Sequence, residues 1–148
     1  GYRETIAGIQ SQMPGDGVIT NASGTATTLE LSPTNTARYE FSGIMRDKNS
    51  ASATTGALSL IKTGQGTQVL SGDHYYSGTT RVSAGTLLVN TSLTNTTLAA
   101  PGGEVRVASN ATLGGRGSVY RSVVVESGGV EIRRAKVSRN LAAEVVPR

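Results

Sequence analysis

A lone histidine beside an aspartate is the first place where the sequence could carry out acid–base chemistry. His74 is the only histidine in the chain and follows Asp73 directly. An imidazole next to a carboxylate can move protons near neutral pH. Sequence neighbours in a turn rarely face each other as catalytic partners do. We therefore expect no catalysis from this pair.

Paired carboxylates are the second candidate, because glycoside cleavage needs two of them facing one cleft. Glu104, Glu126 and Glu131 lie on expected β-strands. These strands are about one coil apart in the β-solenoid that the sequence predicts, so the three side chains could line one outer face of it. The simpler interpretation is that they are solvated positions that alternate with buried valines. We predict no catalytic residue and no enzyme.

Glycine-rich turns are candidates for holding an ion or a phosphate. Residues 114–118 resemble a calcium-binding nonapeptide, but Ser118 stands where an aspartate would supply hard oxygen ligands. Gly64 and Gly66 lack the third glycine of a dinucleotide-binding loop. The chain has no cysteine, which excludes thiolate metal sites and disulfides. We expect no metal and no cofactor.

Two adjacent tyrosines, Tyr75 and Tyr76, are the candidate contact for a glycan. Sugar rings stack on exposed aromatic side chains, and the chain has few other aromatic residues. This candidate belongs to the alternative function, a carbohydrate-binding or polysaccharide-degrading β-helix domain.

The charge pattern argues against nucleic acid as a partner. The chain carries a net charge of +4. Residues 1–132 hold equal numbers of basic and acidic side chains, and the excess lies in residues 133–148. A nucleic-acid surface would need a basic stripe with aromatic residues across the folded body. No apolar stretch is long enough to span a bilayer, so we expect no membrane insertion by this segment.

Composition and periodicity together predict a thin all-β solenoid. Gly is the joint most frequent residue type, at 19 copies, and aromatic residues make up only 4%. Short runs rich in β-formers are separated by Gly, Asn and Ser turns. The expected strands are residues 28–31, 38–41, 57–60, 86–89, 104–107, 122–125 and 129–132.

Self-similarity gives the length of one coil. Residues 66–70 recur as residues 85–89. Other apolar pairs at a similar spacing are Phe41 with Leu60, Val89 with Val107, and Val107 with Val125. A coil of three short strands and three turns needs about 18 to 20 residues, which these spacings match.

The coil length predicts the size of the stack and separates it from its competitor. Residues 1–132 would form about seven coils, which would rise about 34 Å. An antiparallel sandwich, the competing fold, has more closely spaced turns and a bulkier core. The sequence therefore favours the solenoid.

Residues 56–89 closely resemble the autotransporter-associated β-strand repeat, also called the passenger-associated transport repeat. The family pattern is Leu-x-Lys-x-Gly-x-Gly-Thr-x-x-Leu-x-Gly, then Tyr-x-Gly-x-Thr, then Gly-Thr-Leu-x-Val. The sequence matches it from Leu60 to Val89. Residues 41–44 and 111–117 resemble degenerate flanking copies. One of the two tyrosines is expected to pack as the family tyrosine does, which leaves at most one for a ligand.

The resemblance implies a right-handed parallel β-helix within the passenger of a Gram-negative type V secreted protein. It implies a stalk or spacer that is extracellular or at the cell surface and assists export and folding, in an adhesin-like setting. The expected partners are neighbouring repeats of the same polypeptide, with surface glycans as a further candidate.

The carboxyl-terminal residues 133–148 form a separate basic tail. Val137, Leu141 and Val145 are spaced as on one face of a short helix. Such a helix would cap the last rung of the solenoid, which otherwise leaves strand edges open. The alternatives are a disordered tail or a segment foreign to the repeat. The domain boundary is therefore predicted at residue 132.

Overall fold

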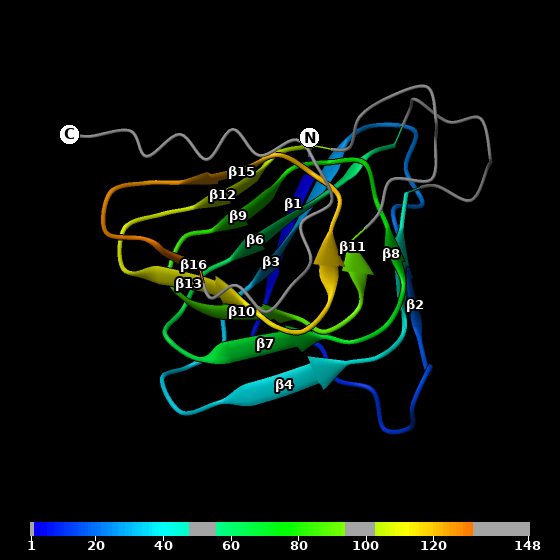
Figure 1. Cartoon of the computed structure of the whole chain (residues 1–148). Coiled ribbons are helices and arrows are strands. Elements are labelled where there is room, and N and C mark those ends of the chain that lie inside the picture. The colour runs from blue at the N-terminus through cyan, green and yellow to red at the C-terminus, as the bar shows by residue number, and fades with distance from the viewer. Residues whose placement is uncertain (1, 48–55, 94–102, 132–148) are drawn as a thin grey trace.

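Every regular element in the described part of the chain is a β-strand (Figure 1). The structure is a computed structural model, and it describes residues 2–47, 56–93 and 103–131. Each of the seven segments predicted as strands overlaps one of the observed strands. The predicted terminal helix lies outside the described residues. No helix in the described ranges is long and apolar enough to cross a membrane.

The strands form three ladders, which we call face 1, face 2 and face 3. Face 1 consists of β1 (Tyr2–Ile6), β3 (Thr27–Leu31), β6 (Leu58–Lys62), β9 (Thr80–Val82), β12 (Val105–Val107) and β15 (Val123–Val125). Face 2 consists of β4 (Arg38–Phe41), β7 (Thr67–Leu70), β10 (Gly85–Val89), β13 (Ala111–Gly114) and β16 (Val130–Glu131). Face 3 consists of β2 (Val18–Thr20), β5 (Ile44–Arg46), β8 (His74–Tyr75), β11 (Ser92–Leu93) and β14 (Ser118–Val119).

From β3 onward the chain visits the faces in the order 1, 2, 3 and then returns to face 1, one coil further along. Successive strands of each face pair in parallel, so each coil stacks on the previous one. Figure 1 shows the three ladders enclosing a single interior. The predicted parallel β-solenoid is confirmed, and the antiparallel sandwich is not the fold. We call β6, β7 and β8 the third coil.

The prediction of about seven coils is wrong, because coil length varies. Leu60 pairs with Thr80, which agrees with the predicted period. Leu29 pairs with Leu60 and Val82 pairs with Val107, and both pairs are more widely separated in the sequence than one predicted coil. Within the described residues the longest ladder has six strands, so the chain stacks in fewer coils than predicted.

Two of the spacings used to predict the period do not join stacked residues. Phe41 lies opposite Leu70 on face 2, whereas Leu60 lies on face 1. Val107 lies between Val82 and Val125 on face 1, whereas Val89 lies on face 2. The 66–70 and 85–89 segments do stack, as β7 pairs with β10. The Val107–Val125 pairing is also confirmed.

The core is a thin column of mainly aliphatic side chains, with up to three residues per strand facing inward. On face 1 the inner row runs through Leu29, Leu60, Thr80, Val105 and Val123, each of which is buried. Alternate residues point outward, as the period of two along a strand requires. Complete burial of one such Leu or Val side chain contributes about 1.5–3 kcal/mol. Stability is thus spread over the stack.

Stacked glycines form the corner between faces 1 and 2. Gly64 and Gly85 both have positive φ, at 66° and 64°. A Cβ on Gly85 would lie 2.5 Å from the carbonyl oxygen of Gly64 in the coil before it, and one on Gly64 would lie 2.3 Å from the Pro33 oxygen. These glycines let successive turns approach closely, which explains why the repeat pattern has glycine there.

Candidate functional site

Buried polar side chains are concentrated in the interior of the third coil and at its edge. The solenoid is otherwise filled mainly by Leu, Val and Ala, yet several polar side chains here are fully buried. Those with no exposed surface are Lys62, Gln68, His74 and Thr80. Burying a polar group is costly unless it is hydrogen-bonded, so the partners of each one decide its effect.

Lys62 satisfies its ammonium group entirely with backbone carbonyls. It stands at the end of β6, and its Nζ donates to Thr63 O at 2.7 Å, Gly64 O at 2.9 Å and Ala84 O at 3.0 Å. The first two acceptors belong to its own turn and the third to the turn of the next coil. Burial lowers the pKa of Lys62 to about 8. This side chain therefore fastens two successive turns together.

Gln68 fastens the amino-terminal segment in a similar way. Its Oε1 accepts from Ile9 N at 3.1 Å, and its Nε2 donates to Ile9 O at 2.9 Å. The side-chain amide thus pairs with one residue's backbone as a neighbouring strand would. Nearby, Ser11 N donates to Glu40 O at 3.0 Å and occupies part of the β4 edge. Residues between β1 and β2 close this side of the solenoid.

Tyr76 and Arg121 occupy the corner between faces 3 and 1. Tyr76 has no exposed surface, and its hydroxyl lies 2.7 Å from Thr80 Oγ1. The Arg121 guanidinium carbon is 4.5 Å from the centre of the Tyr76 ring. Arg121 also donates from Nη1 to Gly78 O at 2.9 Å and from Nη2 to Tyr76 O. Because Arg121 comes 45 residues after Tyr76, it connects coils that are not adjacent in the chain.

Asp47 completes the same corner from the preceding coil. Its carboxylate accepts from Leu58 N at 2.7 Å and from Ser77 N at 2.9 Å. It also acts electrostatically on Arg121. Burial lowers the pKa of Arg121, and Tyr76 and then Asp47 oppose this shift by smaller amounts. This corner therefore combines a cation, an anion and an aromatic ring, and these groups contact the backbone of neighbouring coils and one another.

His74 differs from these residues, because neither of its ring nitrogens has a hydrogen-bond partner. Its ring lies 6.2 Å from that of Phe41, with an angle of 17° between the two planes. Burial lowers its pKa to about 4; Asp73 raises the pKa and Arg121 lowers it further, both by smaller amounts. The imidazole has no exposed surface, which keeps it from any substrate in solution.

The two candidate tyrosines fall on opposite sides of the coil wall. Tyr76 is fully buried, so it cannot stack on a sugar in the folded protein. Tyr75 is half-buried on the outer side of face 3, where it pairs in register with Arg46. Burial raises the pKa of Tyr75, and its hydrogen bond to Asp73 adds to the effect. The glycan contact stays a prediction and rests on Tyr75 alone.

The candidate carboxylates do not converge on one cleft. Glu104 pairs with Arg106, and Glu126 Oε1 lies 3.7 Å from Arg81 Nη2. Glu131 lies on β16, which belongs to face 2. Two of the three are thus neutralised by arginines on face 1, and the third lies on another face.

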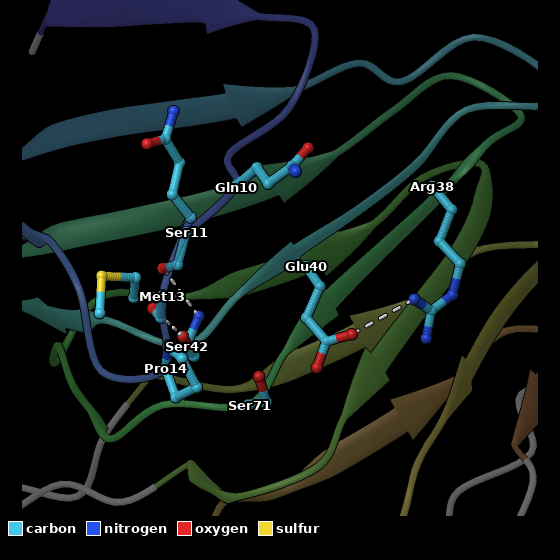
Figure 2. Close-up of a pocket in the computed structure, with 9 residues that line it drawn as sticks. Gln10, Ser11, Met13, Pro14, Arg38, Glu40, Ser42 and Ser71 are labelled. Atoms are coloured by element: carbon cyan, nitrogen blue, oxygen red, sulfur yellow. Dashed lines mark hydrogen bonds and ion pairs between the residues drawn. The ribbon is translucent and has the colours of Figure 1, made fainter.

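A shallow hollow of about 570 Å³ lies beside β4 (Figure 2). Its lining residues are Gln10, Ser11, Gln12, Met13, Pro14, Arg38, Glu40, Ser42 and Ser71. Figure 2 shows Arg38 and Glu40 directed at each other. The distance from Arg38 Nη1 to Glu40 Oε2 is 3.3 Å. The Ser11 and Ser42 hydroxyls already donate to the carbonyls of Asp16 and Met13. Glu40 is the only carboxylate in this lining, so a carboxylate pair is not present there.

The glycine-rich turn at residues 114–118 serves the stacking of coils. A Cβ on Gly115 would lie 2.0 Å from Val89 O, and one on Gly117 would lie 1.9 Å from Thr91 O. Within the described residues no cluster of three or more His, Asp or Glu side chains could hold a metal ion. These glycines are required by the close approach of the preceding coil.

Sequence reasoning missed Gln68, Asp47 and Arg121 as elements of this polar interior. Apart from Val69, whose carbonyl also accepts from Gln68, the partners cited above lie between 11 and 59 residues away with no fixed spacing, so no local motif could have identified them. Lys62, Tyr76 and Thr80, in contrast, occupy named positions of the repeat pattern. The pattern could therefore have indicated that these three side chains point inward.

Comparison with known proteins bears on this same segment. A family model described as passenger-associated-transport-repeat matches residues 60–89. The match covers the third coil from Leu60 onward and continues to the end of β10. No match was found among curated proteins or among solved structures. The resemblance predicted from the motif is confirmed for these residues.

Proposed function

Starting from the passenger-associated transport repeat that residues 60–89 match, we propose that this chain is a structural segment of a secreted, surface-exposed bacterial passenger. It acts as a stalk or spacer, and its ordered stacking assists export and folding. The family match supports an autotransporter association and a location outside the cell or on its surface. Its partners are the neighbouring repeats of the same polypeptide.

One observation carries this proposal: the motif side chains of the matched repeat point into the stack. Lys62 binds the turns of two coils, and Tyr76 packs under Arg121. The corner glycines allow neighbouring turns to touch. A repeat whose pattern is fixed by stacking contacts is suited to building length and stiffness. Catalysis would instead place motif residues in an accessible cleft.

Assistance to export follows from how a solenoid folds. Each coil forms contacts mainly with its neighbours, so folding can proceed one coil at a time as the chain emerges. A pre-formed coil offers an open edge on which the next strand pairs. Under this proposal, folding outside the cell favours continued translocation.

The proposal is tested by displaying the chain between an export signal and an outer-membrane translocator. Two glycines with positive φ provide a matched pair of variants. In Gly85→Ala the new Cβ would lie 2.5 Å from Gly64 O, whereas in Gly15→Ala it would meet nothing within 4 Å. We expect surface display, measured by antibody labelling of intact cells, to fall several-fold for Gly85→Ala only. Equal display of both variants would refute a role for stacking in export.

A carbohydrate-binding role is the second candidate, and it rests on the placement of Tyr75. This side chain is half-buried beside Arg46 on the outer side of face 3. A sugar could stack on it while the guanidinium donates to hydroxyls. Binding to a glycan array that Tyr75→Ala abolishes would support this candidate over a purely structural segment.

A further inference from the structure

His74 is fully buried in the third coil, beside apolar side chains. It belongs to β8, and its position in the ladder lies between Met45 of β5 and Leu93 of β11. Met45 is itself fully buried, and the ring of Phe41 from β4 stacks beside the imidazole. The imidazole therefore packs beside apolar side chains of the preceding coil.

This enclosure suits only the neutral form of the ring. A neutral imidazole has one donor and one acceptor, and in His74 both nitrogens are without a partner. Protonation would add a second donor and a full charge in the same place. Isolated charges are strongly disfavoured in an apolar interior, so the cation is favoured only after the coil opens to water.

The charged groups around His74 do not offset this cost. Arg121, from the turn before β15, already places a buried cation nearby, and it is bound to Tyr76. Asp73 precedes His74 but is exposed to water, which screens its charge. Asp47 acts on Arg121 and is bonded to Leu58 N and Ser77 N. Arg46 follows the buried Met45 and is therefore directed to the other side of its strand.

We propose that His74 is an acid-sensitive weak point of the solenoid, so that mildly acidic surroundings loosen the third coil. In neutral medium the uncharged ring packs between its neighbours and the stack is closed. In acid, the proton binds the ring only in an opened coil, and its binding holds that coil open. The inference does not depend on the proposed function.

The sign of the effect follows from linkage. The folded-state pKa of about 4 lies below the ordinary value of 6.5. The unfolded chain therefore binds more protons between these two values, and stability falls as the pH drops from 6.5 to 4. Well above pH 6.5 this contribution to stability is fully present. The linkage relation gives an unfolding constant about 30-fold larger at pH 5 than at pH 7.5 from this residue.

Urea unfolding of wild type and two variants at pH 7.5 and pH 5, followed by far-ultraviolet circular dichroism, separates the effect of His74 on stability from the effects of all other titrating groups. The variant is His74→Leu, which suits a position beside Met45 and Phe41, and the matched control is Met45→Leu on the same ladder. We expect wild type and Met45→Leu to show an extra rise of about 30-fold in the unfolding constant in acid that His74→Leu lacks. The same pH dependence in all three proteins would overturn the proposal.

A second measurement uses wild-type protein alone. Since His74 is the only histidine, its ring proton resonances in a nuclear magnetic resonance spectrum belong to one residue. We expect these resonances to stay constant in the folded protein from pH 7.5 to pH 5. A titration with a midpoint near 6.5 and an intact folded spectrum would show that the ring is protonated without opening, contrary to the proposal.

Discussion

Lys62 and His74 lie inside the same coil, are equally inaccessible to solvent and have opposite surroundings. The ammonium of Lys62 has three carbonyl acceptors, contributed by its own turn and the next one. The imidazole of His74 has no acceptor or donor on either nitrogen. Burial lowers the pKa of both groups, to about 8 and about 4. Of the two, only Lys62 therefore joins coils, whereas His74 fills space.

The difference shows what holds a thin solenoid together. With a column of mainly aliphatic residues as its core, the molecule needs additional contacts between coils. It obtains them from side chains that reach backbone carbonyls, which every turn offers. A polar side chain that reaches no such group contributes volume but leaves a weak point. The comparison predicts that pairing, rather than burial or location, decides the effect of a substitution.

Arg121→Met tests this idea with the largest expected effect. Arg121 lies near His74 but is bonded to the carbonyl oxygens of Tyr76 and Gly78 and packs on the Tyr76 ring. Methionine retains much of the volume and loses the hydrogen bonds and the cation. We expect a loss of about 3 kcal/mol in the free energy of unfolding, measured in urea at neutral pH. A loss below about 1 kcal/mol would show that location matters more than pairing.

Lys62→Met should have the next largest effect. The substitution leaves three carbonyls without their buried donor, at an expected cost of about 2 kcal/mol at neutral pH. The folded-state pKa of about 8 lies below the ordinary 10.5, so the unfolded chain binds more protons between them. Stability should therefore rise with pH over that window in wild type relative to Lys62→Met. Parallel pH profiles would contradict the lowering of the Lys62 pKa by burial.

Tyr75→Ala should have the smallest effect, because this ring lies outside the coil wall. We expect less than about 0.5 kcal/mol, as for most surface substitutions. Tyr76→Phe is the matched inner variant, since it removes only the hydroxyl that contacts Thr80. Thermal unfolding of the two variants compares the sides directly. A larger effect from Tyr75→Ala would reverse the assignment of inner and outer tyrosine.

The strands and their parallel stacking could be predicted because solenoid sequences carry local signals. Alternation marks each strand, and residues 66–70 repeat as residues 85–89 at the spacing of one coil. The number of coils could not be predicted, since coils differ in length. Leu29 stacks on Leu60, and nothing in the sequence indicates that these two stacked residues are separated by more than one repeat period. A constant coil length predicts that Phe41 and Leu60 stack, although they lie on different faces.

The candidate site shows the same limit. The sequence predicted that one tyrosine of the pair packs inside, but alternation alone could not say which one. Gln68 and Ile9 are 59 residues apart, and their pairing follows only from the path of the amino-terminal segment. The hydrogen-bond status of His74 depends on side chains from several coils. Such contacts are products of the tertiary structure, and the sequence order does not encode them locally.

Cysteine cross-linking tests the register between coils directly, because the chain has no cysteine of its own. Thr86 pairs with Thr112 on face 2, although the two are further apart in the sequence than one repeat period. A coil of constant length would instead place Thr86 near Arg106, which lies on face 1. Stacked strands lie about 4.8 Å apart, within the range that a disulfide spans.

The measurement is the yield of disulfide after mild oxidation, determined by mass spectrometry for two double variants. The structure predicts rapid and nearly complete bridging in Thr86→Cys/Thr112→Cys and little in Thr86→Cys/Arg106→Cys. The opposite preference would mean that coils of constant length stack without insertions, and the interior described for the third coil would then be wrong.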